Sequence, residues 1–134
     1  MRNSTDQRSI ILTDTVKILL LDAANQNTLA IVRHLGKAGH EIHLVGYQKR
    51  SLAFYSKYAF RKYIFADPRK DPESYMKSIL ELISKETFGM IMPVGFKSYQ
   101  ICSQNRDAIR KYTRLIITSD ERSEEHTSEL QVTL

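Results

Sequence analysis

The sequence predicts an α/β fold in which an open parallel sheet of about five strands carries helices on both faces. Short apolar, β-type runs recur along the chain, and most segments between them show the three- or four-residue apolar period of a helix. The 134 residues are enough for one ordinary domain. Hydrophobic residues make up 42% and charged residues 26%, a balance typical of a globular protein and not of a disordered one.

The first strand is expected at residues 16–21, a nearly continuous apolar run typical of a central strand buried on both faces. A helix should follow, because Asn25 and Asn27 are favoured helix caps and apolar residues then recur at every third position. Gly39 supplies the left-handed residue that ends such a helix. Residues 41–46 then form the second strand and complete a βαβ unit.

The middle of the chain predicts a third strand and a second helix. Residues 47–58 are basic and aromatic, with one helical turn expected from Ser51. The third strand is expected at residues 62–66. A helix should run from Asp71 to about Lys85, because an acidic cap followed by proline is a strong start signal. The residues expected on its inward face are Tyr75, Ile79, Leu82 and Ile83.

The last predicted elements are a strand at residues 88–92, a helix at about residues 97–112 and a strand at residues 114–118. The residues expected to face inward on this helix are Ile101, Ala108, Ile109 and Tyr112. Strands that alternate with helices through short connections form parallel sheets with right-handed crossovers. The fold expected is therefore Rossmann-like, with strand order 3-2-1-4-5.

This strand order places a ligand site at the carboxyl ends of the first and fourth strands, where the order reverses. Residues 22–28 and 93–97 would flank the crevice, and residues 47–51 would lean over it. Helix N-termini in the two flanking loops favour an anion, while Asp22 could hold a substrate amine or the next helix. The candidate substrate-binding residues are Asp22, Asn25, Gln26, Asn27, Pro93, Val94 and Gly95.

Missing motifs exclude several function classes. Residues 22–27 contain no glycine, and the second strand ends in Gly46-Tyr47 with no carboxylate, so we expect no nicotinamide-dinucleotide site. The chain has no P-loop motif. A phosphorelay receiver would need a lysine after the fifth strand, where residues 118–120 are Thr-Ser-Asp.

We expect no catalytic residue and no metal site in this chain. His34, His40 and His43 lack metal-ligand spacing with a cysteine or acidic partner. Cys102 is interpreted as a small buried apolar residue, and a single cysteine excludes an internal disulfide. No apolar run approaches the ~18–20 residues that span a bilayer, and no secretion signal begins the chain. These features predict a cytoplasmic protein without membrane contact.

The formal net charge is +5, and the basic excess is spread over doublets such as Lys49-Arg50 and Arg61-Lys62. Dispersed doublets on an α/β domain are usually solvated, so nucleic acid is not an expected partner, although tyrosines are interleaved with them. Part of this charge could instead face an anionic substrate or another domain.

The last thirteen residues, 122–134, differ in composition from the rest, with three glutamates and one arginine. Residues 122–131, RSEEHTSELQ, resemble the in-frame translation of a common sequencing adapter, AGATCGGAAGAGCACACGTCTGAACTCCAG, in all ten codons. We interpret residues 122–134 as an adapter-derived tail and expect the native sequence to be lost after about Glu121. Residues 1–15 form a polar leader expected to lack fixed structure, and residues 16–121 form the domain.

Four groups of residues occur in a fixed order along this domain. They are Asp22 with AIVRHLGKAGHEI at residues 30–42, Ser51-Leu52-Ala53 with Ser56-Lys57-Tyr58, Asp67-Pro68 with Asp71-Pro72-Glu73, and Met90-Ile91-Met92-Pro93-Val94. Over residues 16–118 the chain thereby resembles the start of ATP-grasp proteins of the carbamoyl-phosphate-synthase-like type. It departs from that family after the fourth strand, where Gly95-Phe96-Lys97 stands in a loop that often carries an acid.

The resemblance implies a pre-ATP-grasp domain, the module that precedes the ATP-binding domain. The complete enzymes of this superfamily activate a carboxylate as an acyl phosphate with ATP and Mg²⁺ and transfer it to an amine or similar nucleophile. In those enzymes the residues that bind the nucleotide and the metal lie in the later domain. The resemblance therefore implies that the partner of this chain is a missing C-terminal ATP-grasp domain. It also implies that this chain alone binds no cofactor and has no ligase activity. The alternative is a stand-alone Rossmann-like module that binds a small anionic ligand.

Overall fold

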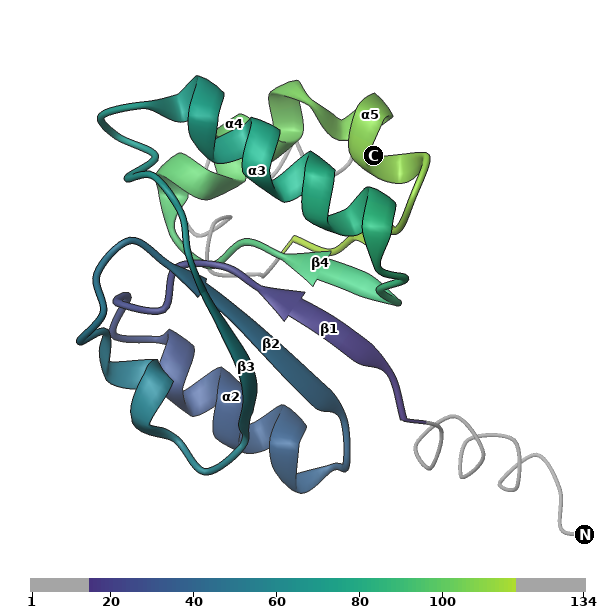
Figure 1. The fold of residues 1–134 in the computed structure, drawn as a ribbon. Helices are drawn as coiled ribbons and strands as arrows, with labels where there is room; N and C mark the ends of the chain where they lie inside the picture. Colours follow the sequence, from purple (N-terminus) through teal and green to yellow (C-terminus); the bar gives the residue numbers. More distant parts are fainter. Residues whose placement is uncertain (1–14, 118–134) are drawn as a thin grey trace, which may run out of the picture.

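The computed structural model describes residues 15–117, which form a five-stranded, all-parallel open sheet of order β3-β2-β1-β4-β5 (Figure 1). This confirms the predicted α/β class and strand order. The elements are β1 (Lys17–Leu20), α2 (Thr28–Lys37), β2 (Glu41–Gly46), the 3-10 helix η1 (Leu52–Tyr55), β3 (Ala59–Ile64), α3 (Pro72–Lys85), β4 (Met90–Met92), α4 (Phe96–Gln104), α5 (Arg106–Arg110) and β5 (Arg114–Leu115).

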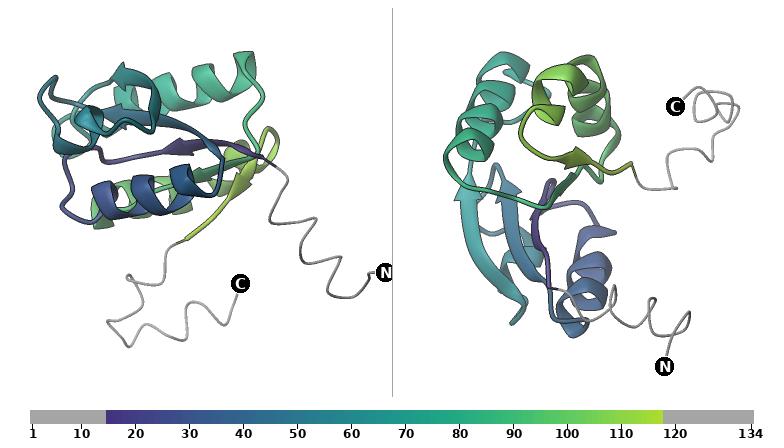
Figure 2. Two further views of the ribbon diagram at one scale, coloured as in Figure 1. Left: turned by 90° about the horizontal axis from the view of Figure 1, so that it is seen from below. Right: turned by 90° about the vertical axis from the view of Figure 1, so that its right-hand side faces the viewer.

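The sheet separates two apolar layers, with α3, α4 and α5 on one face and α2 on the other (Figures 1 and 2). Central strand β1 pairs with β2 and β4, so Ile18 lies between Ile42 and Met90. Its side chains alternate between the layers, with Leu19 packed on the α3 side and Leu20 on the α2 side. Burial on both faces explains why residues 18–20 are all apolar, whereas Lys17, at the partly exposed start of the strand, pairs with Glu86.

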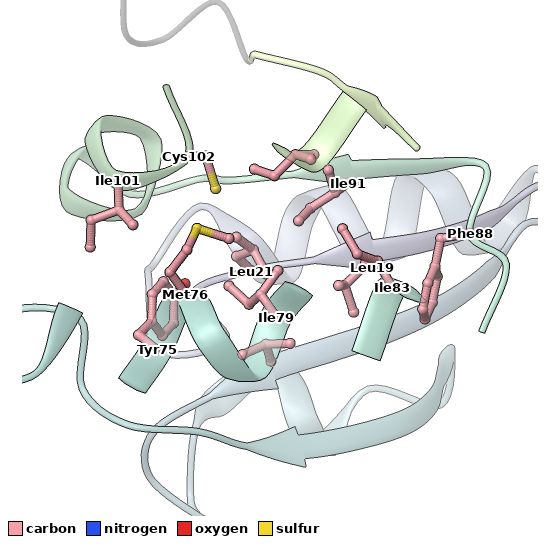
Figure 3. Packing of buried hydrophobic residues seen from close by; sticks show 12 residues of the cluster. Leu19, Leu21, Tyr75, Met76, Ile79, Ile83, Phe88, Ile91, Ile101 and Cys102 are labelled. Atoms are coloured by element: carbon pink, nitrogen blue, oxygen red, sulfur yellow. The ribbon is translucent and has the colours of Figure 1, made fainter. Parts of the chain in front are cut away.

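Helix α3 begins and ends where its sequence predicts. The Asp71 carboxylate accepts a hydrogen bond from the Ser74 N–H at 3.1 Å, and Pro72 occupies the first helical position. Among the expected inward residues, Tyr75, Ile79 and Ile83 are buried, whereas Leu82 is only partly buried. Figure 3 shows three of these side chains in the cluster that α3 builds against β1 and α4, together with Met76, which the sequence analysis did not select.

Strand β3 begins earlier than predicted, at Ala59 and not at Lys62, and ends at Ile64. Its start is decided by pairing with β2, where a register shift lies between Ile42 and His43. β3 is an edge strand and is mostly exposed. Its sequence therefore lacks the apolar pattern of a buried strand that would indicate where it begins.

The predicted helix at residues 97–112 is interrupted, and this prediction is wrong. Helix α4 ends at Gln104, because the Asn105 side-chain amide donates a hydrogen bond to the Ile101 carbonyl at 2.8 Å and competes with the helical pattern. Helix α5 then starts at Arg106. The break leaves Ala108 half-buried and Tyr112 exposed, although Ile101 and Ile109 are buried as expected.

The remaining boundaries differ by a few residues. The described part of the last strand is Arg114–Leu115, shorter than predicted, and β4 is limited to Met90–Met92. Gly39 ends α2 with φ of +95°, as predicted. The polar leader, apart from residue 15, and the adapter-like tail at 122–134 lie outside the described residues. No helix within residues 15–117 is long and apolar enough to cross a membrane.

Burial of Cys102 predicts a loss of stability in alkali. Burial, reinforced by the negative charge of Asp22, raises the pKa of its thiol from an ordinary value of 9.0 to about 12. The unfolded chain therefore releases this proton above about pH 9 while the folded chain keeps it. The free energy of unfolding should then fall by up to ~1.4 kcal/mol per pH unit above pH 9.

Urea unfolding at pH 7, 8, 9 and 10 measures this slope. Cys102→Ala leaves a small cavity costing roughly 1 kcal/mol at pH 7, and it should have a shallower alkaline slope than the wild type. Equal slopes for the two proteins would show that the thiol is not responsible.

Candidate functional site

Asp22 lies directly beyond β1 and binds the start of α4 through its carboxylate. Its Oδ2 accepts hydrogen bonds from the backbone N–H groups of Val94 at 3.0 Å and Gly95 at 2.7 Å. Its Oδ1 accepts a hydrogen bond from the Ser98 hydroxyl at 2.5 Å. The residue adopts φ of +69°, a left-handed conformation that Asp tolerates better than most residues.

The Asp22 side chain has a structural role, which was one of the two expectations for it. Its side chain holds a helix, but the helix is α4 and not the one that follows in sequence. Its backbone carbonyl also accepts a hydrogen bond from the Thr28 hydroxyl, at the start of α2. The N-terminus of a helix attracts negative charge, and at α4 the chain itself supplies that charge.

A buried hydrogen bond extends the contact to α3. The Tyr75 hydroxyl lies 2.6 Å from the Ser98 hydroxyl, so Ser98 bridges Tyr75 and Asp22. Burial, reinforced by the negative charge of Asp22, raises the pKa of Tyr75 well above its ordinary range. Tyr75 therefore stays neutral at physiological pH and connects the site to the core.

The loop after β1 is shaped by Asn25 and not by Asn27. The Asn25 side-chain oxygen accepts a hydrogen bond from the Asn27 N–H at 2.8 Å, which forms a tight turn before α2. Asn27 occupies the N-cap position of α2, as predicted, but its side chain makes no capping hydrogen bond.

A cavity of about 270 Å³ lies at the carboxyl ends of the strands, where the parallel arrows of β1, β2 and β4 point in Figure 1. Its lining residues are Asp22, Ala24, Asn25, Tyr47, Pro68, Arg69, Gly95, Phe96 and Lys97. Three of the predicted site residues, Asp22, Asn25 and Gly95, are thus brought together. The other four, Gln26, Asn27, Pro93 and Val94, do not line it; the first two are exposed, and the last two are buried.

Arg69 is a charged residue of the cavity that the sequence analysis did not select. It follows β3, and the carboxyl ends of parallel strands share one edge, which is the signal that could have identified it. Its guanidinium donates a hydrogen bond to the Tyr47 hydroxyl at 2.7 Å, and its Nε lies 3.4 Å from Asp67 Oδ1. The guanidinium carbon also lies 5.6 Å from the centre of the Tyr47 ring.

Asp67 keeps this arginine in place as a charged partner. Burial of the Asp67 carboxyl opposes its ionisation, but hydrogen bonds from the backbone and side chain of Arg69 outweigh burial and lower its pKa. The other cation of the cavity is Lys97, whose Nζ lies 3.4 Å from the Gln100 side-chain oxygen. The cavity therefore combines two cations with a carboxylate that is already bound by three donors.

The other residues considered for chemistry have structural partners away from the cavity. His43 is buried between the Tyr63 hydroxyl at 3.1 Å and the Glu41 carboxylate at 2.6 Å. His40 Nδ1 accepts a hydrogen bond from the Val16 N–H. Within residues 15–117, no group of three or more His, Cys, Asp or Glu side chains could hold a metal ion.

Comparison of the chain with models of known protein families found no match, and comparison with curated protein sequences found none.

We expect Asp22→Asn to lower the free energy of unfolding by about 2 kcal/mol, because an amide cannot replace the charged acceptor of three hydrogen bonds at a helix N-terminus. Urea unfolding measures the loss, and hydrogen exchange should show faster exchange at the Val94 and Gly95 amides. The matched control is Asp107→Asn in the first turn of α5, which is exposed and should change stability by less than ~0.5 kcal/mol. Equal losses for the two variants would contradict the capping role of Asp22.

Proposed function

We propose that this domain is the N-terminal, substrate-side domain of an ATP-grasp ligase, and that its cavity binds a small anionic substrate. The parent enzyme would form a carboxylate–amine or related bond through an acyl phosphate. One observation supports the binding site: Arg69 and Lys97 line the same cavity. Asp22 supplies the only carboxylate among the described residues that line it, and this carboxylate already accepts three hydrogen bonds.

The positions of the motif residues support the ATP-grasp part of this proposal. Gly36 and Tyr58 belong to two separate motifs, and they are in close contact, because a Cβ on Gly36 would approach the Tyr58 ring to 2.3 Å. Asp67 orients Arg69, and Asp71 caps α3. Asp22 ties together the two loops that flank the crevice. The Gly36–Tyr58 contact lies at the amino ends of β2 and β3, and the contacts of Asp22, Asp67 and Asp71 lie at the carboxyl ends of the strands, so motif residues have structural roles at both edges of the sheet.

ATP and Mg²⁺ do not fit the described residues. Mg²⁺ prefers several oxygen ligands, and the cavity carboxylate of Asp22 is bound by backbone and hydroxyl donors. The turn after β1 contains no glycine that would let the backbone approach a polyphosphate. We therefore assign nucleotide and metal binding to a following ATP-grasp domain, and no step of ligase chemistry to this chain alone.

The purified chain should bind small anions but should neither bind nor hydrolyse ATP–Mg²⁺. In a nuclear magnetic resonance titration with acetate and then sulfate at constant ionic strength, the largest amide shifts should fall on Asn25, Arg69 and residues 95–97. The same anions should raise the melting temperature, because a ligand that binds only the folded state stabilises it. Shifts confined to other surfaces, or no shift with either anion, would contradict an anion site in this cavity.

Sequencing the source gene across codon 121 in a single long read tests the ATP-grasp assignment independently. We expect the reading frame to continue into a domain that contains nucleotide-clamping lysines and a glycine-rich loop. If the read instead shows codons 122–134 followed by a stop, the alternative of a stand-alone anion-binding module is favoured.

A further inference from the structure

We propose that the ligand of this cavity carries two negative charges, as a dicarboxylate or a phosphate monoester does, and that Arg69 and Lys97 select for it. This inference rests on the proposed anion site and specifies its ligand. It depends on the charges that line the cavity, on their existing partners and on the cavity volume.

The cavity offers cationic N–H donors from two separate loops. Two of the lining side chains are cations, and they come from different loops, Arg69 from the loop after β3 and Lys97 from the first turn of α4. The opposing charge of Asp22 is directed into the N-terminus of α4, where two N–H groups and the Ser98 hydroxyl hold it. Asp67 already pairs with Arg69, so the preference for a dianion rests on the free N–H donors of two separate cations, which a ligand with two anionic groups can engage together.

Arg69 is oriented before a ligand arrives. The Tyr47 hydroxyl accepts a hydrogen bond from Nη2 at 2.7 Å, and the contact of Nε to Asp67, at 3.4 Å, is long for a hydrogen bond. The donors that remain include both hydrogens of Nη1, and such a planar fork suits the paired oxygens of a carboxylate or phosphate. The Tyr47 contact restrains this exposed side chain in part, which lowers the side-chain entropy that binding costs.

Lys97 supplies a second positive charge with free donors. Its ammonium carries three N–H groups, and the contact to Gln100 at 3.4 Å is long for a hydrogen bond. Lys97 can therefore bind a second oxyanion, while Asn25 contributes a neutral amide to the same cavity.

The cavity volume is sufficient for a small metabolite. The cavity measures about 270 Å³ and is partly open to solvent. The exposed ring of Phe96 and the ring of Tyr47 border this space and can contact a short carbon skeleton between two charged groups.

Isothermal titration at pH 8 and constant ionic strength tests the inference with sulfate and succinate as dianions and acetate as a monoanion. We expect at least one dianion to bind about tenfold more tightly than acetate. Arg69→Gln and Lys97→Gln should each weaken dianion binding about tenfold and acetate binding much less. Lys37→Gln, at the far end of α2 and outside the cavity, is the matched control and should change each affinity less than twofold.

The outcomes separate this inference from the proposed function. Acetate binding in the cavity as tightly as both dianions would overturn the dianion inference and leave the anion site intact. Unchanged dianion affinity in both cavity variants would likewise overturn the assigned roles of Arg69 and Lys97. Absence of binding by all three anions would overturn the anion site itself, and the inference with it. Unfolding curves of each variant, matched to the wild type, show that an affinity loss is not a folding defect.

Discussion

The carboxylate of Asp22 connects the central strand of the sheet to helix α4, and the architecture of the crevice depends on this contact. The side chain spans residues that are 72 to 76 positions apart in sequence and satisfies two backbone N–H groups and one hydroxyl at once. Ser98 also forms a hydrogen bond with Tyr75, which lies in the core. A single ionised group thus aligns β1, α3 and α4 at the edge of the sheet where a ligand would bind.

This contact also changes the electrostatics of the crevice. In an open α/β sheet the helix N-termini at the switch point commonly serve as anion sites. Here α4 receives an internal carboxylate, so positive charge available to a ligand comes mainly from side chains. Arg69 and Lys97 provide that charge, and Tyr47 and Asp67 hold Arg69 across two loops.

Two layers of apolar side chains fix the positions of the strands from which these loops extend. Leu19 and Leu21 anchor the α3 side of β1, and Ile18 and Leu20 anchor the side that carries α2. The fully buried strand leaves little freedom for the residue that follows it, so Asp22 can be held in a left-handed conformation. In α/β domains the strands usually form a rigid scaffold and the loops carry the polar residues, and this chain has the same arrangement.

The sequence by itself determined the elements whose signals are local. The apolar run of β1 indicates burial on both faces, the Asp71 cap with Pro72 defines the start of α3, and Gly39 ends α2. These signals act within a few residues of the backbone that they control. The alternation of strands and helices then restricts the strand order, because parallel crossovers are right-handed.

Only the tertiary structure decided how distant residues share the site. The start of β3 depends on its register with β2. The helix that Asp22 caps and the presence of Arg69 in the cavity follow from loops that meet only when the sheet is assembled. Hydrogen bonds and charge pairs of this kind act over a few ångströms in space, and the spacing of residues along the sequence does not reveal which of them come that close.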